Sequence, residues 1–142
     1  MADEPIHYAA PVIGDIVWCR FPEQLVKPKP APKPRPGIVI QAFEPREKGD
    51  PYVVHVCPGT SQLRGIYAHE LLIDPEQHPD EYAPTGLSYS TKFDLRRIAA
   101  LPYTSEWFEP PPNPRYGAIP KMGSLHPATV PRLRACYRAG RS

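Results

Sequence analysis

One arginine stands where a proline-rich basic loop enters a predicted strand. The segment 27–36 alternates proline with mostly basic residues, and Arg35 is its last cation. Because Arg35 precedes a proline, we expect an extended backbone there, with the side chain held next to a rigid sheet. A guanidinium in that place can bind two phosphate oxygens at once through its planar donors. The other interpretation is a loop arginine that only contacts water.

Two hydroxyl residues, Thr60 and Ser61, follow the third predicted strand directly after Pro58-Gly59. In an antiparallel meander, the end of the third strand lies at the same end of the sheet as the start of the second strand. We therefore expect Thr60 to face Arg35. Hydroxyls and free backbone N–H groups at such a corner can hold a phosphate oxygen. Alternatively, the two residues only cap the turn.

Other polar and aromatic residues carry weaker signals. Lys27, Lys29 and Lys33 could follow a nucleic-acid backbone or simply keep the proline-rich loop soluble. His55 lies in the middle of a predicted strand, and no partner that would orient it as a base can be named. Trp18 is expected in the core, with a stacking platform for a base as the alternative. The sequence contains no P-loop, no dinucleotide fingerprint and no Ser/His/Asp spacing.

Length and composition favour one soluble domain. The 142 residues are 41% hydrophobic, enough for one core, and the 22 prolines cluster in loops. A net charge of +2 is too small to imply nucleic-acid binding, so any basic surface must be local. The three cysteines lack zinc or disulfide spacing and are predicted to be buried thiols in a reducing compartment. Because no apolar run approaches the ~20 residues of a membrane span and no signal peptide is visible, we expect a cytoplasmic protein without a membrane partner.

The hydrophobic pattern predicts a small β-rich (α+β) domain with a terminal helix. Its short strands favour a compact, barrel-like sheet. Residues 1–12 form a loose lead-in to a single domain at 13–142, with a Pro/Lys-rich loop at 22–36 and a polar insertion at 74–90. The C-terminal helix spans about 129–139, with Thr129 as its cap and Gly140 as its end. Strands are expected at 13–20, 36–43, 52–57, 67–73 and 91–96, with a short strand or turn at 98–103.

An ordered set of motifs resembles the PemK/MazF-like toxins of bacterial toxin–antitoxin pairs. The resemblance covers 13–61 well and 88–105 loosely. It implies an SH3-like, partly open antiparallel β-barrel with a C-terminal helix, and a homodimer. The proline-rich first loop, the insertion 74–90 and the segment 109–121 depart from the family pattern. The motifs are Gly14-Asp15-Ile16-Val17-Trp18, Phe21-Pro22, Arg35-Pro36-Gly37-Ile38-Val39-Ile40, Pro58-Gly59-Thr60-Ser61 and Ser90-Thr91-Lys92-Phe93-Asp94-Leu95.

The resemblance also implies an activity. Members of the family cleave single-stranded RNA without a metal or other cofactor, by attack of the ribose 2′-OH on the adjacent phosphate. Arg35 matches the catalytic arginine and Thr60 the catalytic threonine. RNA-binding residues are then expected at Lys27, Lys29, Lys33, Ser61 and Gln62.

The implied protein partner is a cognate antitoxin, a partly disordered acidic chain laid over the basic loop. A rival hypothesis keeps the barrel but removes the catalysis. In that case the chain is an interaction module that binds a protein, as related toxins that poison gyrase do, or binds nucleic acid without cutting it.

Overall fold

A computed structural model describes residues 4–142 of the chain. It contains seven strands and two α-helices, with short 3-10 turns at Ala83–Thr85 and Pro127–Thr129. The strands are β1 (Asp15–Cys19), β2 (Arg35–Phe43), β3 (Val53–Thr60), β4 (Glu70–Ile73), β5 (Thr91–Asp94), β6 (Ala99–Pro102) and β7 (Lys121–Ser124), and the helices are α1 (Pro79–Tyr82) and α2 (Val130–Arg141).

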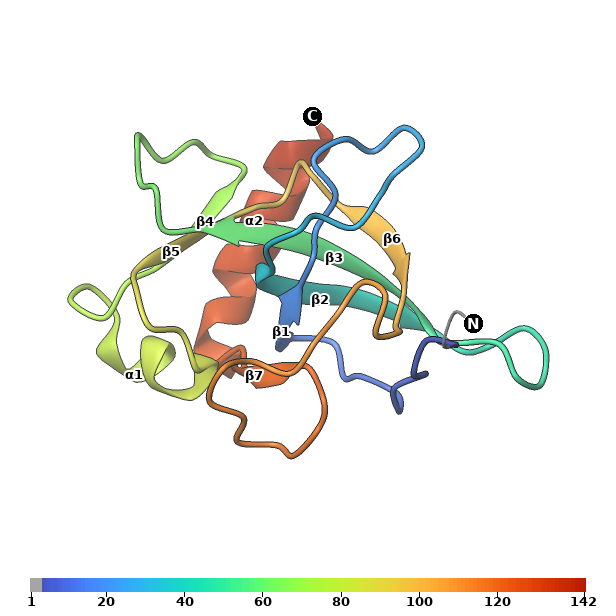
Figure 1. The fold of residues 1–142 in the computed structure, drawn as a ribbon. Helices are drawn as coiled ribbons and strands as arrows, with labels where there is room; N and C mark the ends of the chain where they lie inside the picture. The colour runs from blue at the N-terminus through green and yellow to red at the C-terminus, as the bar shows by residue number, and fades with distance from the viewer. Residues whose placement is uncertain (1–3) are drawn as a thin grey trace.

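The strands form one curled, partly open antiparallel sheet, which confirms the predicted fold class (Figure 1). Its order is β4-β5-β3-β2-β1-β7, and β6 also pairs with β3. Strand β3 is the centre of this arrangement, because it pairs with β2 along most of its length, with β6 over its first half and with β5 at its end. The predicted meander of the first three strands is confirmed by the β1–β2 and β2–β3 pairings.

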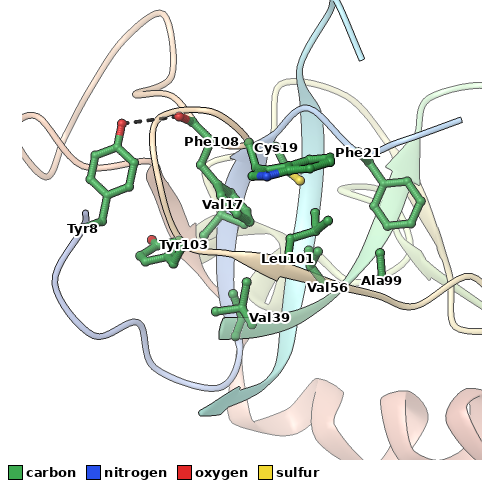
Figure 2. Close-up of a cluster of buried hydrophobic side chains, with 12 residues drawn as sticks. Tyr8, Val17, Cys19, Phe21, Val39, Val56, Ala99, Leu101, Tyr103 and Phe108 are labelled. Atoms are coloured by element: carbon green, nitrogen blue, oxygen red, sulfur yellow. Dashed lines mark hydrogen bonds between the residues drawn. The ribbon is translucent and has the colours of Figure 1, made fainter. Parts of the chain in front are cut away.

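Both faces of the sheet are buried, since successive residues of a strand alternate between two hydrophobic clusters. Ile16 and Ile38 belong to one cluster, while Val17 and Val39 belong to the other. Figure 2 shows the second of these clusters, in which the Tyr8 hydroxyl donates to the carbonyl of Phe108. The strand sequences are therefore nearly continuous apolar runs.

Helix α2 covers the face that carries Ile16 (red in Figure 1), where Leu133 and Cys136 pack on the cluster. Two expected features of this helix are wrong. The helix continues through Gly140, where a Cβ would lie 3.0 Å from the carbonyl oxygen of Leu95, so the glycine allows close packing. Thr129 precedes the helix but does not cap it, because its hydroxyl donates to a carboxylate of α1.

Three segments differ from expectation. Pro58-Gly59 does not end the third strand, because β3 leaves β2 at Pro58 and continues beside β5 from Gly59 onward. The segment 109–121, in which no strand is expected, ends in β7, which pairs with β1. Of the lead-in, residues 1–3 lie outside the described part, and the rest is docked, because Tyr8 is buried and its N–H donates to the carbonyl of Tyr103.

The insertion 74–90 contains α1 and a 3-10 turn. Within residues 4–142, no helix has the length and apolar character needed to cross a bilayer.

Candidate active site at the β1–β2–β3 corner

Arg35 and Thr60 lie at one corner of the sheet. The last residue pair of the β2–β3 ladder is Gly37 opposite Pro58. Arg35 and Thr60 are each two residues further along their strands, so side-chain alternation places them on the same face. Both line one cavity of about 410 Å³. The structure thus brings Arg35 and Thr60 to one cavity at the corner where the sequence predicts that their strands meet.

The Arg35 side chain is exposed at the mouth of this cavity. Its backbone is held on the other side by β1, where Cys19 is its register partner. Among residues 4–142, no acceptor or carboxylate binds its guanidinium. The donors of Arg35 are therefore available to an external anion, while the sheet fixes the residue's position.

Thr60 is partly buried and ends β3. Its Oγ1 accepts a hydrogen bond of 3.1 Å from the N–H of Gln62, which closes a short turn. The hydroxyl proton of Thr60 remains available to donate, so capping the turn and contacting a ligand are compatible. Ser61 and Gln62 follow on this turn, are exposed, and also line the cavity.

The basic loop between β1 and β2 brings one of its three lysines to the site. Lys33 lines the cavity, whereas Lys27 and Lys29 are exposed outside it. Part of the loop folds back onto the domain, although a run of prolines alternating with basic residues favours an extended, semi-rigid arm. Ala31 is buried and its N–H donates to the Arg20 carbonyl, and Lys27 takes a positive φ of 51° where the chain turns.

Comparison with known proteins bears on this corner. The family model described as PemK-like, MazF-like toxin of type II toxin-antitoxin system matches residues 13–109. The chain belongs to this family. The match includes both Arg35 and Thr60.

Solved structures show the same fold. A Mycobacterium tuberculosis toxin MazF-mt6 superposes with a TM-score of 0.56 at 18% identity, over 89% of this chain and 95% of that one. An endoribonuclease in complex with its cognate antitoxin from Mycobacterial species superposes with a TM-score of 0.58 at 14% identity, over 93% of this chain and 95% of that one. An endoribonuclease from Mycobacterial species superposes with a TM-score of 0.54 at 13% identity, over 94% of this chain and 92% of that one. No curated protein matches the sequence.

Behind Thr60 of this toxin lies an ion pair that the sequence did not reveal. Lys92 of β5 is the register partner of Thr60 and is only 9% exposed. Its Nζ lies 3.0 Å from Oε2 of Glu70 and donates to the carbonyls of Arg64 and Gly65. Burial opposes ionisation of Glu70, but the N–H of Tyr67 and the Lys92 ammonium outweigh it and hold the pKa of that carboxyl below its usual value. Lys92 thus ties the loop after Thr60 to the sheet.

The carboxylate of Glu70 also lies near His69 and Asp94, and the ligand atoms of these three residues are within 4.8 Å of one another. Such a set can hold a cation in principle. Here Lys92 already provides the positive charge on Glu70, and Nε2 of His69 lies 3.7 Å from Oδ1 of Asp94. The cluster is therefore a polar network in which the ion pair of Lys92 and Glu70 braces β5 against β4.

Sequence reasoning missed the far wall of the cavity. Trp18, expected in the core, is partly exposed and lines the cavity, as its alternative role would require. The sequence predicts that the first two strands pair, but the structure is needed to show that Trp18 is the register partner of Pro36 and hence a neighbour of Arg35. Tyr89, which is 71% exposed, comes from the polar insertion and gave no signal. Further lining residues are Leu87, Ser88, Thr91 and Met122.

His55 and the buried cysteines lie outside this cavity. The His55 ring packs 4.9 Å from the ring of Phe43 and faces a groove beside α2, so it is not placed to act on a ligand of Arg35. Cys19 and Cys57 are buried, as predicted, and Cys136 is partly exposed. Burial raises the pKa of Cys19 strongly and that of Cys57 to about 12, so neither thiol supplies a nucleophile at neutral pH.

Proposed function

We propose that this toxin is a sequence-selective, metal-independent endoribonuclease that cleaves single-stranded RNA. The observation that carries the proposal is the shared cavity of Arg35 and Thr60, in which an exposed guanidinium without a partner among the described residues lies near a hydroxyl. Membership of the toxin family and the names of two structural neighbours, both endoribonucleases, support it.

The proposed reaction is an internal transesterification. The ribose 2′ oxygen forms a bond to phosphorus and loses its proton, while the bond from phosphorus to the 5′ oxygen breaks and that oxygen gains a proton. The products are a 2′,3′-cyclic phosphate and a free 5′-OH. Arg35 stabilises the negative charge on the pentacoordinate phosphate through its fixed donors. Thr60 donates its hydroxyl proton to a phosphate oxygen and so orients the phosphate, or relays a proton.

The RNA backbone follows the basic side of the cavity. Lys33, Ser61 and Gln62 contact the nucleotides next to the scissile phosphate, since all three line the cavity. Lys27 and Lys29, exposed on the same loop, attract the phosphates beyond it. The proposed active form is a cytoplasmic homodimer. A cognate antitoxin, an acidic segment that folds on binding, covers the basic loop and blocks access to Arg35.

Cleavage of a long, unstructured RNA tests the proposal. Wild type, Arg35→Ala and Thr60→Ala are compared in the presence of EDTA, and the new 5′ ends are labelled by polynucleotide kinase without prior phosphatase treatment. We expect wild type to cut and leave 5′-OH ends, and Arg35→Ala to be slower by about 10²–10³-fold, as for loss of one transition-state donor. Arg46→Ala, at an exposed arginine in the β2–β3 turn, is the matched control and should retain full activity.

Two results contradict the proposal. If folded wild type leaves the RNA intact, the barrel is a binding module and its partner should be sought instead. If Arg35→Ala cuts as fast as wild type, a different group stabilises the transition state.

A further inference from the structure

A second cavity adjoins the candidate active site. Its volume is about 490 Å³, and it shares one wall with the cavity of Arg35 and Thr60. Five residues line both cavities, so a chain bound in the first cavity lies next to the second. The shared residues are Trp18, Leu87, Ser88, Tyr89 and Met122.

The wall from the 74–90 insertion is held rigidly. The Tyr82 hydroxyl donates to the carbonyl of Leu87 at 2.7 Å, and the Thr85 hydroxyl donates to the carbonyl of Tyr82. Gly86 has a φ of +73°, and a Cβ there would lie 2.1 Å from the carbonyl oxygen of Met122 in β7. The insertion therefore lies directly on β7 and presents the exposed ring of Tyr89 from a fixed backbone.

The opposite wall comes from the proline-rich loop before β7 (orange in Figure 1). Both ends of this loop are bonded to the backbone of one residue, Trp18. The Trp18 N–H donates to the carbonyl of Pro120 at 2.9 Å, and the Glu109 N–H donates to the Trp18 carbonyl at 3.2 Å. Glu109 is also ion-paired with Arg20 at 3.0 Å. Trp18 is thus the point at which the loop closes.

The chemistry of the second cavity suits a nucleotide. Trp18 and Tyr89 offer aromatic surface for a base, and Asn113 offers an amide. Arg115 lines the same cavity, is exposed, and has no carboxylate partner among residues 4–142. Its free guanidinium is complementary to a phosphate.

We propose that the second cavity is a nucleotide subsite for single-stranded RNA, next to the scissile phosphate. The base of the neighbouring nucleotide stacks on Trp18 and Tyr89, and Arg115 binds the phosphate beyond it. The proposal rests on the proposed ribonuclease function. It also extends the RNA contact beyond the residues that match the family model, because Arg115 lies outside 13–109, whereas Trp18 and Tyr89 lie within it.

Binding of an uncleavable probe tests the subsite apart from catalysis. The probe is a mixed-sequence RNA 12-mer with 2′-O-methyl groups throughout, which lacks the attacking hydroxyl. The chain has two tryptophans, Trp18 and the buried Trp107, so base stacking on Trp18 should quench part of the fluorescence. We expect this quench in wild type and its loss in Trp18→Phe, a substitution that keeps an aromatic ring in β1.

Affinity and its salt dependence separate the two contacts. Tyr89→Ala should weaken binding by about tenfold without changing the slope of log K against log salt, because stacking involves no counterion release. Arg115→Ala should reduce the magnitude of that slope by about 0.7, the value for one phosphate contact on a single strand. A loss of packing alone would not change the slope. Arg46→Ala is the control for a change of one surface charge.

Each outcome decides the subsite. If the probe binds without quenching Trp18 fluorescence, or if Arg115→Ala leaves the slope as in wild type and Arg46→Ala, the proposal is overturned. If Trp18→Phe, Tyr89→Ala and Arg115→Ala all respond as expected, the subsite binds RNA, even in a preparation that does not cleave RNA. Failure of the ribonuclease proposal itself is seen separately, as intact unmodified RNA after incubation with wild type.

Discussion

The ion pair behind Thr60 allows a quantitative prediction. In Lys92→Met the apolar stem of the side chain is kept and the ammonium is removed. Glu70 then keeps its charge in a site where its side chain is 8% exposed, and that of Lys92 is 10% exposed. Breaking a fully buried pair costs about 3–5 kcal/mol, whereas an exposed pair is worth about 0–1 kcal/mol. For a pair just below the surface we expect a loss of about 2–3 kcal/mol in the free energy of unfolding.

Urea unfolding at pH 7 measures this loss, and Lys48→Met, at an exposed lysine of the β2–β3 turn, is the control. The double variant Lys92→Met/Glu70→Gln should recover much of the stability, because no unpaired charge stays buried. RNA cleavage by Lys92→Met should also fall, since the loop after Thr60 loses its anchor at the carbonyls of residues 64 and 65.

The pH dependence of Lys92→Met checks the cause. In wild type the pKa of Glu70 is lowered, so its stabilising contribution is present above the ordinary value of 4.5 and is lost as the pH falls below it. In Lys92→Met, burial without the ammonium raises the pKa of Glu70. Protonation of Glu70 at low pH then removes the unpaired buried charge that destabilises the variant. The difference between the two proteins should therefore shrink from pH 7 to pH 4. A difference below about 1 kcal/mol at pH 7, or one that is constant with pH, would refute the reasoning.

Two further predictions concern stability and thiol chemistry. Gly86→Ala should lower the free energy of unfolding by at least about 2 kcal/mol, measured by thermal melting, because its positive φ disfavours alanine and its Cβ would meet a carbonyl of β7. Gly49→Ala, with a φ of +94° and nothing within 4 Å, should lose less. In the native protein a thiol reagent should label Cys136 alone. The buried Cys19 and Cys57 should react only after urea is added. Rapid labelling of all three thiols in the native protein would contradict the burial of Cys19 and Cys57.

The corner of Arg35 and Thr60 was predictable from the sequence because it depends on local patterns. Apolar runs and turn residues identify the first three strands, and an antiparallel meander then fixes which strand ends meet. To this prediction the structure adds only the exact register of β2 and β3, in which Gly37 pairs with Pro58. The continuation of β3 through Pro58-Gly59 was not predictable, because it requires β5 as a new partner, and β5 lies more than thirty residues later in the chain.

Strand β7 shows a different limit of sequence reasoning. Its residues Lys121–Ser124 have no alternating pattern and follow a proline-rich stretch. They form a strand because the edge of β1 needs a partner and because Gly123 lets the chain approach the backbone of Thr85, where a Cβ would lie 2.3 Å from the carbonyl carbon. These are tertiary causes, and no window of sequence around β7 contains them.

The position of Trp18 follows from the same long-range contacts. In the pattern of β1 it is one apolar residue among others, and the core is the usual place for tryptophan. It reaches the wall between two cavities because the loop of residues 109–120 closes on its backbone and the insertion 74–90 packs beside it. The candidate catalytic pair thus belongs to the part of the chain that matches the family, while Arg115 lies outside it. If RNA binds as proposed, the backbone contact at Arg115 and the cleavage chemistry at Arg35 and Thr60 come from separate segments that meet at Trp18.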